Sequence, residues 1–494
     1  MTTAVAPLPR RWRPRAPRFA LALPSIVWYT IFFVVPIILV VVYSFGTKDT
    51  SRLVPVDFTN PSTASYSAVF DETFFQVFRS TVRIAITATL LCLLIGLPVA
   101  YFAAFKVSEK WRAIVLTAVV VPSFTSFLIR TVAWRIPLAP NGTFSKWLQD
   151  IGVIGDQGIQ ILETAAAVQL AIVYNYLGFM ILPLYVAFDR IDSRLREASK
   201  DLGAGRLATF FGVTLPLAGP GIAAGVLLTF IPMCGDYVTA TVLGGAKGNM
   251  IGAMIASQFN AAQNWPLGSA MAVLMIGAVL LTLVVGTVLV WGVPKVLALF
   301  EPLIQAWRRS RAAKPRDAGA EPSTRSGLAD RVLHRSLGVW ATLVLIFMFI
   351  PVLLVFLHSF NRGNSFTIWS NAVSTKWWGE LFDGAIFVQT ALLFAGIVVV
   401  ALVTRRLLKR RAQFGGSYTA WVVPSGLVLA LVVNGVITSW YANLFDFPGI
   451  GDAIRNSFLA ALGATIIAVL LGGTAGVALA RRPGAWSSAF MVVV

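Results

Sequence analysis

Long uninterrupted runs of apolar residues dominate the chain, and short polar segments separate them. Roughly 20 apolar residues are needed for an α-helix to cross the hydrocarbon core of a bilayer, and these runs have that length. Membrane β-barrel strands would instead alternate in polarity over short stretches. The pattern predicts an all-α polytopic membrane protein with ten helices and the start of an eleventh near Ser487. The ten predicted spans are 19–45, 81–105, 113–135, 163–188, 217–243, 267–300, 337–360, 385–403, 420–440 and 457–480.

The composition agrees with this class. Only 12% of the residues are charged and the mean hydropathy is +0.78, whereas soluble domains carry about 25% charged residues. A soluble enzyme, a disordered chain and a fibrous protein are therefore excluded. The two cysteines, Cys92 and Cys234, lie inside apolar runs, and His334 and His358 stand apart from each other. No catalytic residue and no metal site are predicted.

The net charge of +19 could suggest a nucleic-acid partner, but its placement argues against one. Of the 40 Lys and Arg residues, 28 lie in six segments that hold only 9 of the 21 Asp and Glu residues. One of these segments precedes the first helix and the other five follow every second helix, which is the positive-inside pattern of membrane proteins. We therefore expect a lipid bilayer as partner, no nucleic acid, and a cytoplasmic N-terminus at residues 1–18. The basic segments are 10–18, 106–112, 189–206, 301–335, 404–411 and 481–482.

An internal repeat divides the chain into two units. Residues 33–45 resemble residues 348–360 in the pattern of apolar residues around Pro36 and Pro351. The Arg-, Ala-, Pro- and Ser-rich residues 301–336 are expected to be a flexible cytoplasmic linker. A first unit at 19–300 with six helices and a second at 337–494 would then follow each other in parallel. The motif Trp-x-x-x-Leu-Phe-Asp occurs at 377–383 and again at 440–446, which indicates a helix pair inserted at about 385–440.

The segment after the fourth predicted helix carries a specific motif. It runs Glu197-Ala-Ser-Lys-Asp-Leu-Gly203, continues for nine residues, and ends in Val213-Thr-Leu-Pro216. A short helix over 194–202 is expected, with Gly203 or Gly205 ending it. Such a helix on the cytoplasmic face could transmit motion from a soluble partner into the membrane helices.

This motif resembles the coupling loop of ABC-importer permeases, which has the pattern Glu-Ala-Ala, three residues, Gly, nine residues, Ile-x-Leu-Pro. The spacing matches throughout, with Ser199 in place of the second Ala and Val213 in place of Ile. The resemblance implies that loop 190–216 docks onto a cytoplasmic ABC ATPase dimer. The chain lacks a phosphate-binding lysine motif and is not itself an enzyme. It would bind no cofactor, and ATP and Mg would be held by the ATPase. The coupling residues would be Glu197, Ala198, Asp201, Gly203, Leu215 and Pro216.

Further segments resemble the first permease subunit of spermidine/putrescine importers. They are 130–134, 174–177, 230–239, 243–245, 250–252, 258–259 and 264–270, and the likeness covers 19–300. Residues 337–384 and 440–494 resemble the start of the partner permease subunit. The resemblance implies a type I ABC-importer permease fold, polyamine transport across a bacterial inner membrane by alternating access, and an extracytoplasmic solute-binding protein that delivers substrate.

The second unit departs from the family pattern. Its own coupling loop would fall near residue 573, about 80 residues after Val494, as the repeat offset in the sequence indicates. We therefore expect this unit to be truncated, through a shortened sequence, a frameshift or a split permease that a second permease chain completes.

Ionisable residues inside membrane helices are costly and mark candidate functional sites. Carboxylate and aromatic groups suit a polycation, the latter through cation–π contacts. The candidate pathway residues are Asp236, Tyr237, Tyr174, Asn175, Tyr176 and Arg130. A structural Asp236–Arg130 ion pair that never meets substrate is the competing interpretation. For the whole chain, the sequence also leaves open an ABC importer for thiamine, iron, phosphonate or sugar, an ion-gradient transporter, and a membrane enzyme.

Overall fold

The computed structural model describes residues 23–299 except 53 and 71, residues 324–377 except 364, 366, 367, 370 and 371, and residues 456, 460, 461 and 463–472. The predictions for residues 1–18, for linker residues 301–323, for the inserted pair 385–440 and for the eleventh helix lie outside the described residues. The chain divides into two compact structural units, to which the words first and second unit refer from here on. The first consists of residues 1–39 and 376–494, and the second consists of residues 40–375.

The first unit contains the beginning of the first predicted membrane helix. Helix α1 (Leu23–Tyr29), a single wide turn η1 (Thr30–Val34) and α2 (Val35–Tyr43) follow one another without a break, and α2 continues past the unit boundary. The helix Gly463–Gly472 belongs to the same unit. The Ser25 hydroxyl donates to the Leu471 carbonyl at 2.8 Å, which joins the two segments.

The second unit is built around α4 (Glu72–Phe105), α9 (Ala165–Asp189) and α13 (Gly219–Cys234), which pack on one another. Helices α5 (Glu109–Val120) and α18 (Thr324–His358) pack on α4, and α16 (Trp265–Leu299) packs on α15 (Ile251–Asn260) and α3 (Ala64–Val69). Strands β1 (Thr47–Lys48) and β2 (Val56–Asp57) pair antiparallel, with Thr47 opposite Asp57. The remaining short elements are η2 (Val121–Phe124), α6 (Phe127–Ala133), α7 (Arg135–Leu138), α8 (Thr143–Asp150), α10 (Ser193–Asp201), α11 (Arg206–Thr209), η3 (Phe210–Thr214), α12 (Leu215–Leu217), α14 (Tyr237–Thr239) and η4 (Ala240–Gly244).

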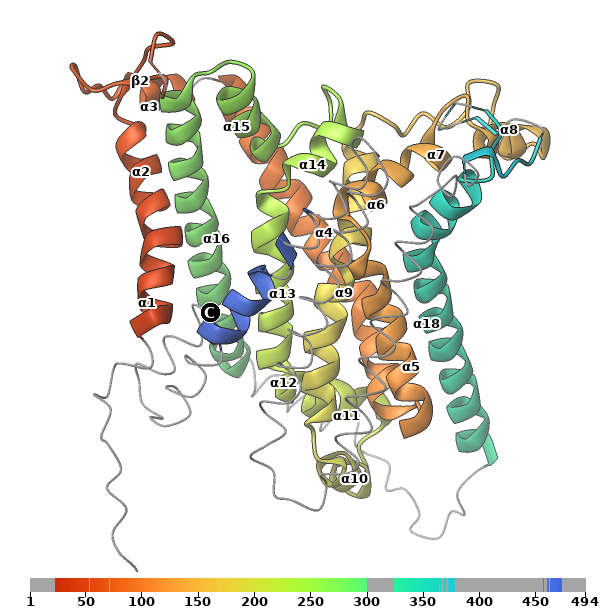
Figure 1. The fold of residues 1–494 in the computed structure, drawn as a ribbon. Helices are drawn as coiled ribbons and strands as arrows, with labels where there is room; N and C mark the ends of the chain where they lie inside the picture. The colour runs from red at the N-terminus through yellow and green to blue at the C-terminus, as the bar shows by residue number, and fades with distance from the viewer. Residues whose placement is uncertain are drawn as a thin grey trace, which may run out of the picture. The chain divides into compact units, whose positions relative to one another are not determined.

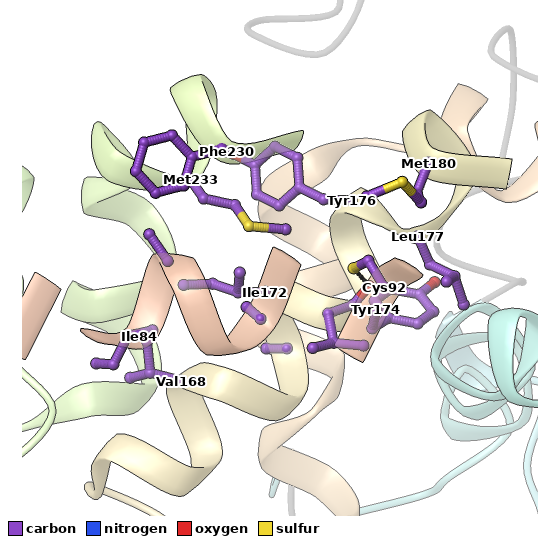
Figure 2. Close-up of a cluster of buried hydrophobic side chains, with 14 of the residues drawn as sticks. Ile84, Cys92, Val168, Ile172, Tyr174, Tyr176, Leu177, Met180, Phe230 and Met233 are labelled. Carbon is purple, nitrogen blue, oxygen red and sulfur yellow. Dashed lines mark hydrogen bonds between the residues drawn. The ribbon is translucent and has the colours of Figure 1, made fainter. Parts of the chain in front are cut away.

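The core of the second unit lies where α4, α9 and α13 meet (Figure 2). Its side chains are apolar and fully buried, among them Ile84, Cys92, Ile172, Leu177, Met180 and Met233. Glycine lets α13 approach α9 closely, because a Cβ atom at Gly221 would collide with the Cβ of Ala187. Helix packing in membranes depends on such small residues, since lipid offers no hydrophobic driving force between helices.

Five helices are long and apolar enough to cross a membrane, and up to seven if each of two bent pairs counts as one span, within the described residues. The prediction of an all-α polytopic membrane protein is confirmed. In the second unit, α10 lies at one end of the membrane helices, and α7, α8 and α15 lie at the opposite end (Figure 1).

Two helices were predicted as continuous spans, and both predictions are wrong because each helix is broken. The span predicted at 113–135 bends by 91° between Phe124 and Phe127. Pro122, which cannot donate a backbone hydrogen bond, forms a 3₁₀ turn there, and Thr125 is extended. The span predicted at 217–243 bends by 65° where α12 meets α13. It then ends at Cys234, and Asp236 is extended, with ψ 98°.

Two further boundaries differ from the prediction. Helix α18 begins at Thr324, inside the predicted linker and earlier than residue 337. Its first turns contain charged residues, so a search for apolar runs does not include them in the helix. The segment 244–266, which lies between two of the predicted spans, contains the helix α15.

Candidate functional site

The coupling segment forms a short helix, α10, that is capped at both ends. Its N-terminus is capped by Asp192, whose Oδ1 accepts from the Arg194 backbone N–H at 3.0 Å. Its C-terminus ends at Gly203, which has φ +84°, and the Ala204 N–H donates to the Ser199 carbonyl at 3.0 Å. This is the left-handed glycine cap that commonly ends helices. The predicted helix over 194–202 and its stop at Gly203 are confirmed.

One face of α10 is anchored to the membrane helices. The Arg196 guanidinium lies 3.8 Å from the centroid of the Phe105 ring, and its Nη2 donates to the Tyr101 hydroxyl at 3.4 Å. The hydroxyls of Ser199 and Thr209 are hydrogen-bonded at 3.1 Å, which ties α10 to α11. These contacts hold α10 against the ends of α4 and α11, so a force on α10 would reach both.

The remaining surface of α10 is open. Glu197, Ala198, Asp201 and Gly203 are exposed. Leu195 is 49% and Leu202 89% exposed, and together with Ala198 they stand three and four residues apart on one helical face. Two further apolar side chains, Leu207 and Phe211, extend this surface. Of the remaining predicted coupling residues, Leu215 is half-buried and Pro216 is exposed.

A second group of predicted site residues lies buried between the membrane helices. Arg130 is on α6, Tyr174, Asn175 and Tyr176 are on α9, and Asp236 precedes α14; all five are at most 8% exposed. The Tyr176 ring lies 6.1 Å, centroid to centroid, from the ring of Phe127, which also faces Arg130. Tyr237 does not join this group, since it is 52% exposed.

Asp236 is the N-cap of α14. Its Oδ1 accepts from the Thr239 N–H at 2.9 Å, and its Oδ2 accepts from the Thr239 hydroxyl at 2.6 Å. A carboxylate has about four lone-pair positions, so both oxygens retain capacity for a further donor. Thr239 is not among the residues predicted from sequence; the local signal is Asp236 itself, because aspartate is a preferred N-cap residue.

The structural Asp236–Arg130 ion pair is not found among the described residues. The salt bridges in this part of the chain are Arg52–Asp49, Arg52–Asp57 and Arg112–Asp189. Arg130 instead lies over the Phe127 ring, 5.8 Å from its centroid. The bends on either side of α6 and before α14 place the two residues on separate short elements, which a reading of straight helices could not anticipate.

The orientation of the Asn175 amide follows from its neighbours. The Thr131 hydroxyl donates to the Phe127 carbonyl at 2.9 Å, so it can only accept from Asn175 Nδ2, at 3.0 Å. Asn175 Oδ1 is then left as a buried acceptor with no hydrogen-bond partner among the described residues. The donors Arg130 Nε and Trp134 Nε1 are likewise buried without a hydrogen-bond partner among those residues. No cluster of three or more His, Cys, Asp or Glu residues suited to a metal occurs in the described part of the chain.

Comparisons with known proteins agree on one family. Residues 92–296 match the family described as binding-protein-dependent transport system inner membrane component. The spermidine/putrescine transport system permease protein PotB of Haemophilus influenzae is 39% identical over 246 residues, which are 50% of this chain and 84% of that protein. PotB of Escherichia coli K12 is 36% identical over 272 residues, 55% of this chain and 95% of that protein.

A likeness to solved structures was also found. A bacterial ABC transporter involved in the import of the acidic polysaccharide alginate aligns with a TM-score of 0.44 and 20% identity, covering 55% of this chain and 93% of that chain.

Proposed function

The chain belongs to the family of binding-protein-dependent transport system inner membrane components, and from this we propose that it is a permease subunit of an ATP-driven importer that carries polyamines into the cell. The relatives described above are permeases of spermidine/putrescine transport. Their similarity covers 84–95% of their own length, so it concerns nearly the whole permease subunit and not an isolated segment.

The observation that carries the proposal is the form of α10. It is capped at both ends, anchored through Arg196, and exposed along the neighbouring residues Leu195, Ala198 and Leu202. An exposed apolar ridge with polar neighbours is typical of a protein–protein contact. We place the cytoplasmic ATPase dimer on this ridge, with Glu197 and Asp201 at its polar rim. ATP and Mg then belong to the ATPase, and the N-terminus of this chain faces the cytoplasm.

The transport step follows from this attachment. When the ATPase dimer closes, it pulls α10, and Arg196 transmits the movement to α4 through Phe105 and Tyr101. The pathway then opens outward and receives substrate from an extracytoplasmic solute-binding protein. A second permease chain would form the other wall of the pathway.

The pathway residues divide by charge. Asp236 is a buried carboxylate without a cationic side-chain partner among the described residues, and Tyr176 is buried as well. Asn175 Oδ1 adds an acceptor that has no partner among those residues. These groups suit an ammonium group, whereas Arg130 and Tyr174 form the adjacent wall. Tyr237, which is exposed, would meet substrate only at the edge of the pathway.

The test is uptake of labelled putrescine and spermidine by cells that express the natural locus, with and without the ATPase gene. We expect uptake that requires the ATPase and that unlabelled polyamine competes away. If the ATPase co-purifies with the chain but no polyamine enters, the importer assignment stands and polyamine is the wrong substrate. If uptake persists without the ATPase, the coupling role of α10 is wrong.

A further inference from the structure

Helix α8 turns a polar side toward the protein and an apolar side away from it. Ser145 is buried, and its hydroxyl oxygen accepts from the Ile159 backbone N–H at 3.0 Å. Gln149, one turn further along, donates through Nε2 to the Asp156 carbonyl at 2.9 Å. The loop approaches α8 so closely that a Cβ atom at Gly158 would collide with Ser145 Oγ. Hydrogen bonds and close packing therefore fix which side of α8 faces the protein.

The apolar side of α8 is exposed. Phe144, Trp147 and Ile151 follow one another at intervals of three and four residues, so they share one side of the helix. They are 44%, 53% and 52% exposed, respectively. The Phe144 and Trp147 rings stack with 5.9 Å between centroids, which makes them one apolar surface. A surface helix of a soluble domain turns its apolar side to the core, so α8 has the reverse arrangement.

The charged residues of α8 mark a third side of the helix. Lys146 and Asp150 are four residues apart and both are exposed. At 3.6 residues per turn, their mean direction lies about 110° from the apolar side and about 100° from the side that faces the protein. Their opposite charges leave this side polar without a net charge. The three sides of α8 thus suit protein, an apolar medium and water.

Helix α8 begins at the level where a membrane span ends. It lies at the end of the membrane helices opposite α10 (Figure 1). Its first residue, Thr143, accepts through its hydroxyl oxygen from the Trp369 backbone N–H at 2.7 Å. The Trp369 ring meets the His358 ring edge-on with 5.7 Å between centroids. His358 is the last residue of the apolar span that begins at His334. A boundary between lipid and water at this level would meet both the apolar and the charged side of α8.

We propose that α8 lies in the bilayer interface, with Phe144, Trp147 and Ile151 turned toward the lipid acyl chains and with Lys146 and Asp150 turned toward water. Tryptophan is enriched at this depth, because its ring is amphipathic. Helices of this kind lie in the membrane plane with their apolar side about 5–10 Å deep.

The lipid attachment has two consequences. Because α8 carries one lysine and one aspartate, its apolar area and not attraction to anionic lipid provides the binding, so phosphatidylcholine is sufficient. Because α8 packs on α7, it holds the end of the bent α5–α7 segment at the membrane surface. The inference needs only the membrane setting of the chain and is independent of the substrate.

Spin labels on α8 test the proposal in the full-length chain in phosphatidylcholine nanodiscs. The cysteines within the described residues, Cys92 and Cys234, are buried, so a nitroxide reagent should attach to an introduced cysteine. The unaltered chain gives the background. Trp147→Cys and Ile151→Cys place the label on the apolar side. Both positions are exposed, and two positions keep the test valid if one variant does not fold.

The matched controls are Lys146→Cys and Asp150→Cys, on the charged side of the same helix. At each position, collision of the nitroxide with oxygen, which concentrates in lipid, is compared with collision with a water-soluble nickel chelate. We expect the ratio of oxygen to nickel collisions to be several-fold higher at residues 147 and 151 than at residues 146 and 150.

Three results would overturn the proposal. Equal ratios at all four positions would place the apolar side of α8 in water. Low collision with both reagents at residue 147 would mean that a further protein segment covers this side. Access of the nickel chelate to residue 147 that ends when the solute-binding protein of the same locus is added would make the surface a docking site for that protein.

Discussion

Asp236 and Thr239 are joined by two hydrogen bonds, from the Thr239 N–H to Oδ1 at 2.9 Å and from the Thr239 hydroxyl to Oδ2 at 2.6 Å. The two hydrogen bonds cap the start of the short helix α14, which follows the end of α13 at Cys234. The carboxylate is therefore held in a fixed position by its own segment, and it needs no arginine to stay there.

Replacing Thr239 with valine tests this capping role. Valine keeps the shape but removes the hydroxyl, so Oδ2 of Asp236 loses its donor inside the protein. We expect a loss of about 1–3 kcal/mol in the free energy of unfolding, measured by thermal unfolding of the purified chain. Thr239→Ser keeps the hydroxyl and should lose much less. Equal stability of the valine variant and the unaltered chain would contradict the capping role.

Replacing Asp236 with asparagine separates charge from capping. Asparagine is as good an N-cap as aspartate. Its amide oxygen can still accept from the Thr239 N–H, and its NH₂ can donate to the Thr239 hydroxyl oxygen, so the chain should keep most of its stability. The loss of the negative charge should lower polyamine uptake by about tenfold or more in kcat/KM. Unchanged uptake kinetics would reduce Asp236 to a structural cap, and the pathway would have to run elsewhere.

Gly203 and Gly205 offer a matched pair in the coupling segment. Gly203 has φ +84°, whereas Gly205 has φ −66°, and a Cβ atom at either position would meet nothing within 4 Å. Only backbone strain therefore distinguishes the two alanine variants. Gly203→Ala should cost about 1–2 kcal/mol locally, displace the end of α10 and reduce ATPase-dependent uptake. Gly205→Ala should transport normally. Equal uptake by the two variants would show that the left-handed cap is dispensable.

The coupling helix could be predicted from sequence because its signals are local. A capping aspartate, a stop glycine and a full motif spacing all fall within the segment from Asp192 to Pro216. The membrane helices could be predicted only as apolar runs. Hydropathy does not detect the breaks at Pro122 and Gly235, because the residues around them are as apolar as those of a continuous helix.

The buried group of candidate pathway residues shows the same limit of prediction from sequence. Sequence reasoning predicts Arg130, Tyr174, Asn175, Tyr176 and Asp236 together, and all five are buried. The separation of Arg130 from Asp236 depends on the bends before α6 and α14. The contact of Phe347 with Trp134 depends on how α18 packs, some 200 residues along the chain. Sequence patterns carry no information about such long-range geometry.

Arg196 is expected to transmit movement from α10 to the membrane helices. Arg196→Ala removes the stacking on Phe105 and the hydrogen bond to Tyr101, contacts worth about 0.5–2 kcal/mol for the cation–π part. The ATPase should still co-purify, since the exposed face of α10 is unchanged, but substrate-stimulated ATP hydrolysis and uptake should fall. Arg194→Ala, at an exposed position of the same helix, is the control. Equal effects of both variants would assign the loss to overall charge and not to the anchor.

Close packing of α13 on α9 provides the last test, again with a matched pair. A Cβ atom at Gly221 would collide with Ala187 and lie 2.9 Å from the Pro183 carbonyl, whereas one at Gly219 would meet nothing within 4 Å. Gly221→Ala should therefore force the helices apart and lower the free energy of unfolding by about 1–3 kcal/mol. Gly219→Ala should be neutral or stabilising by up to about 1 kcal/mol, because alanine favours the helix. Thermal unfolding of both variants measures the difference. A Gly221→Ala chain as stable as the Gly219→Ala chain would mean that α13 and α9 can separate freely, and the core between them would not hold the pathway residues of α9 in place.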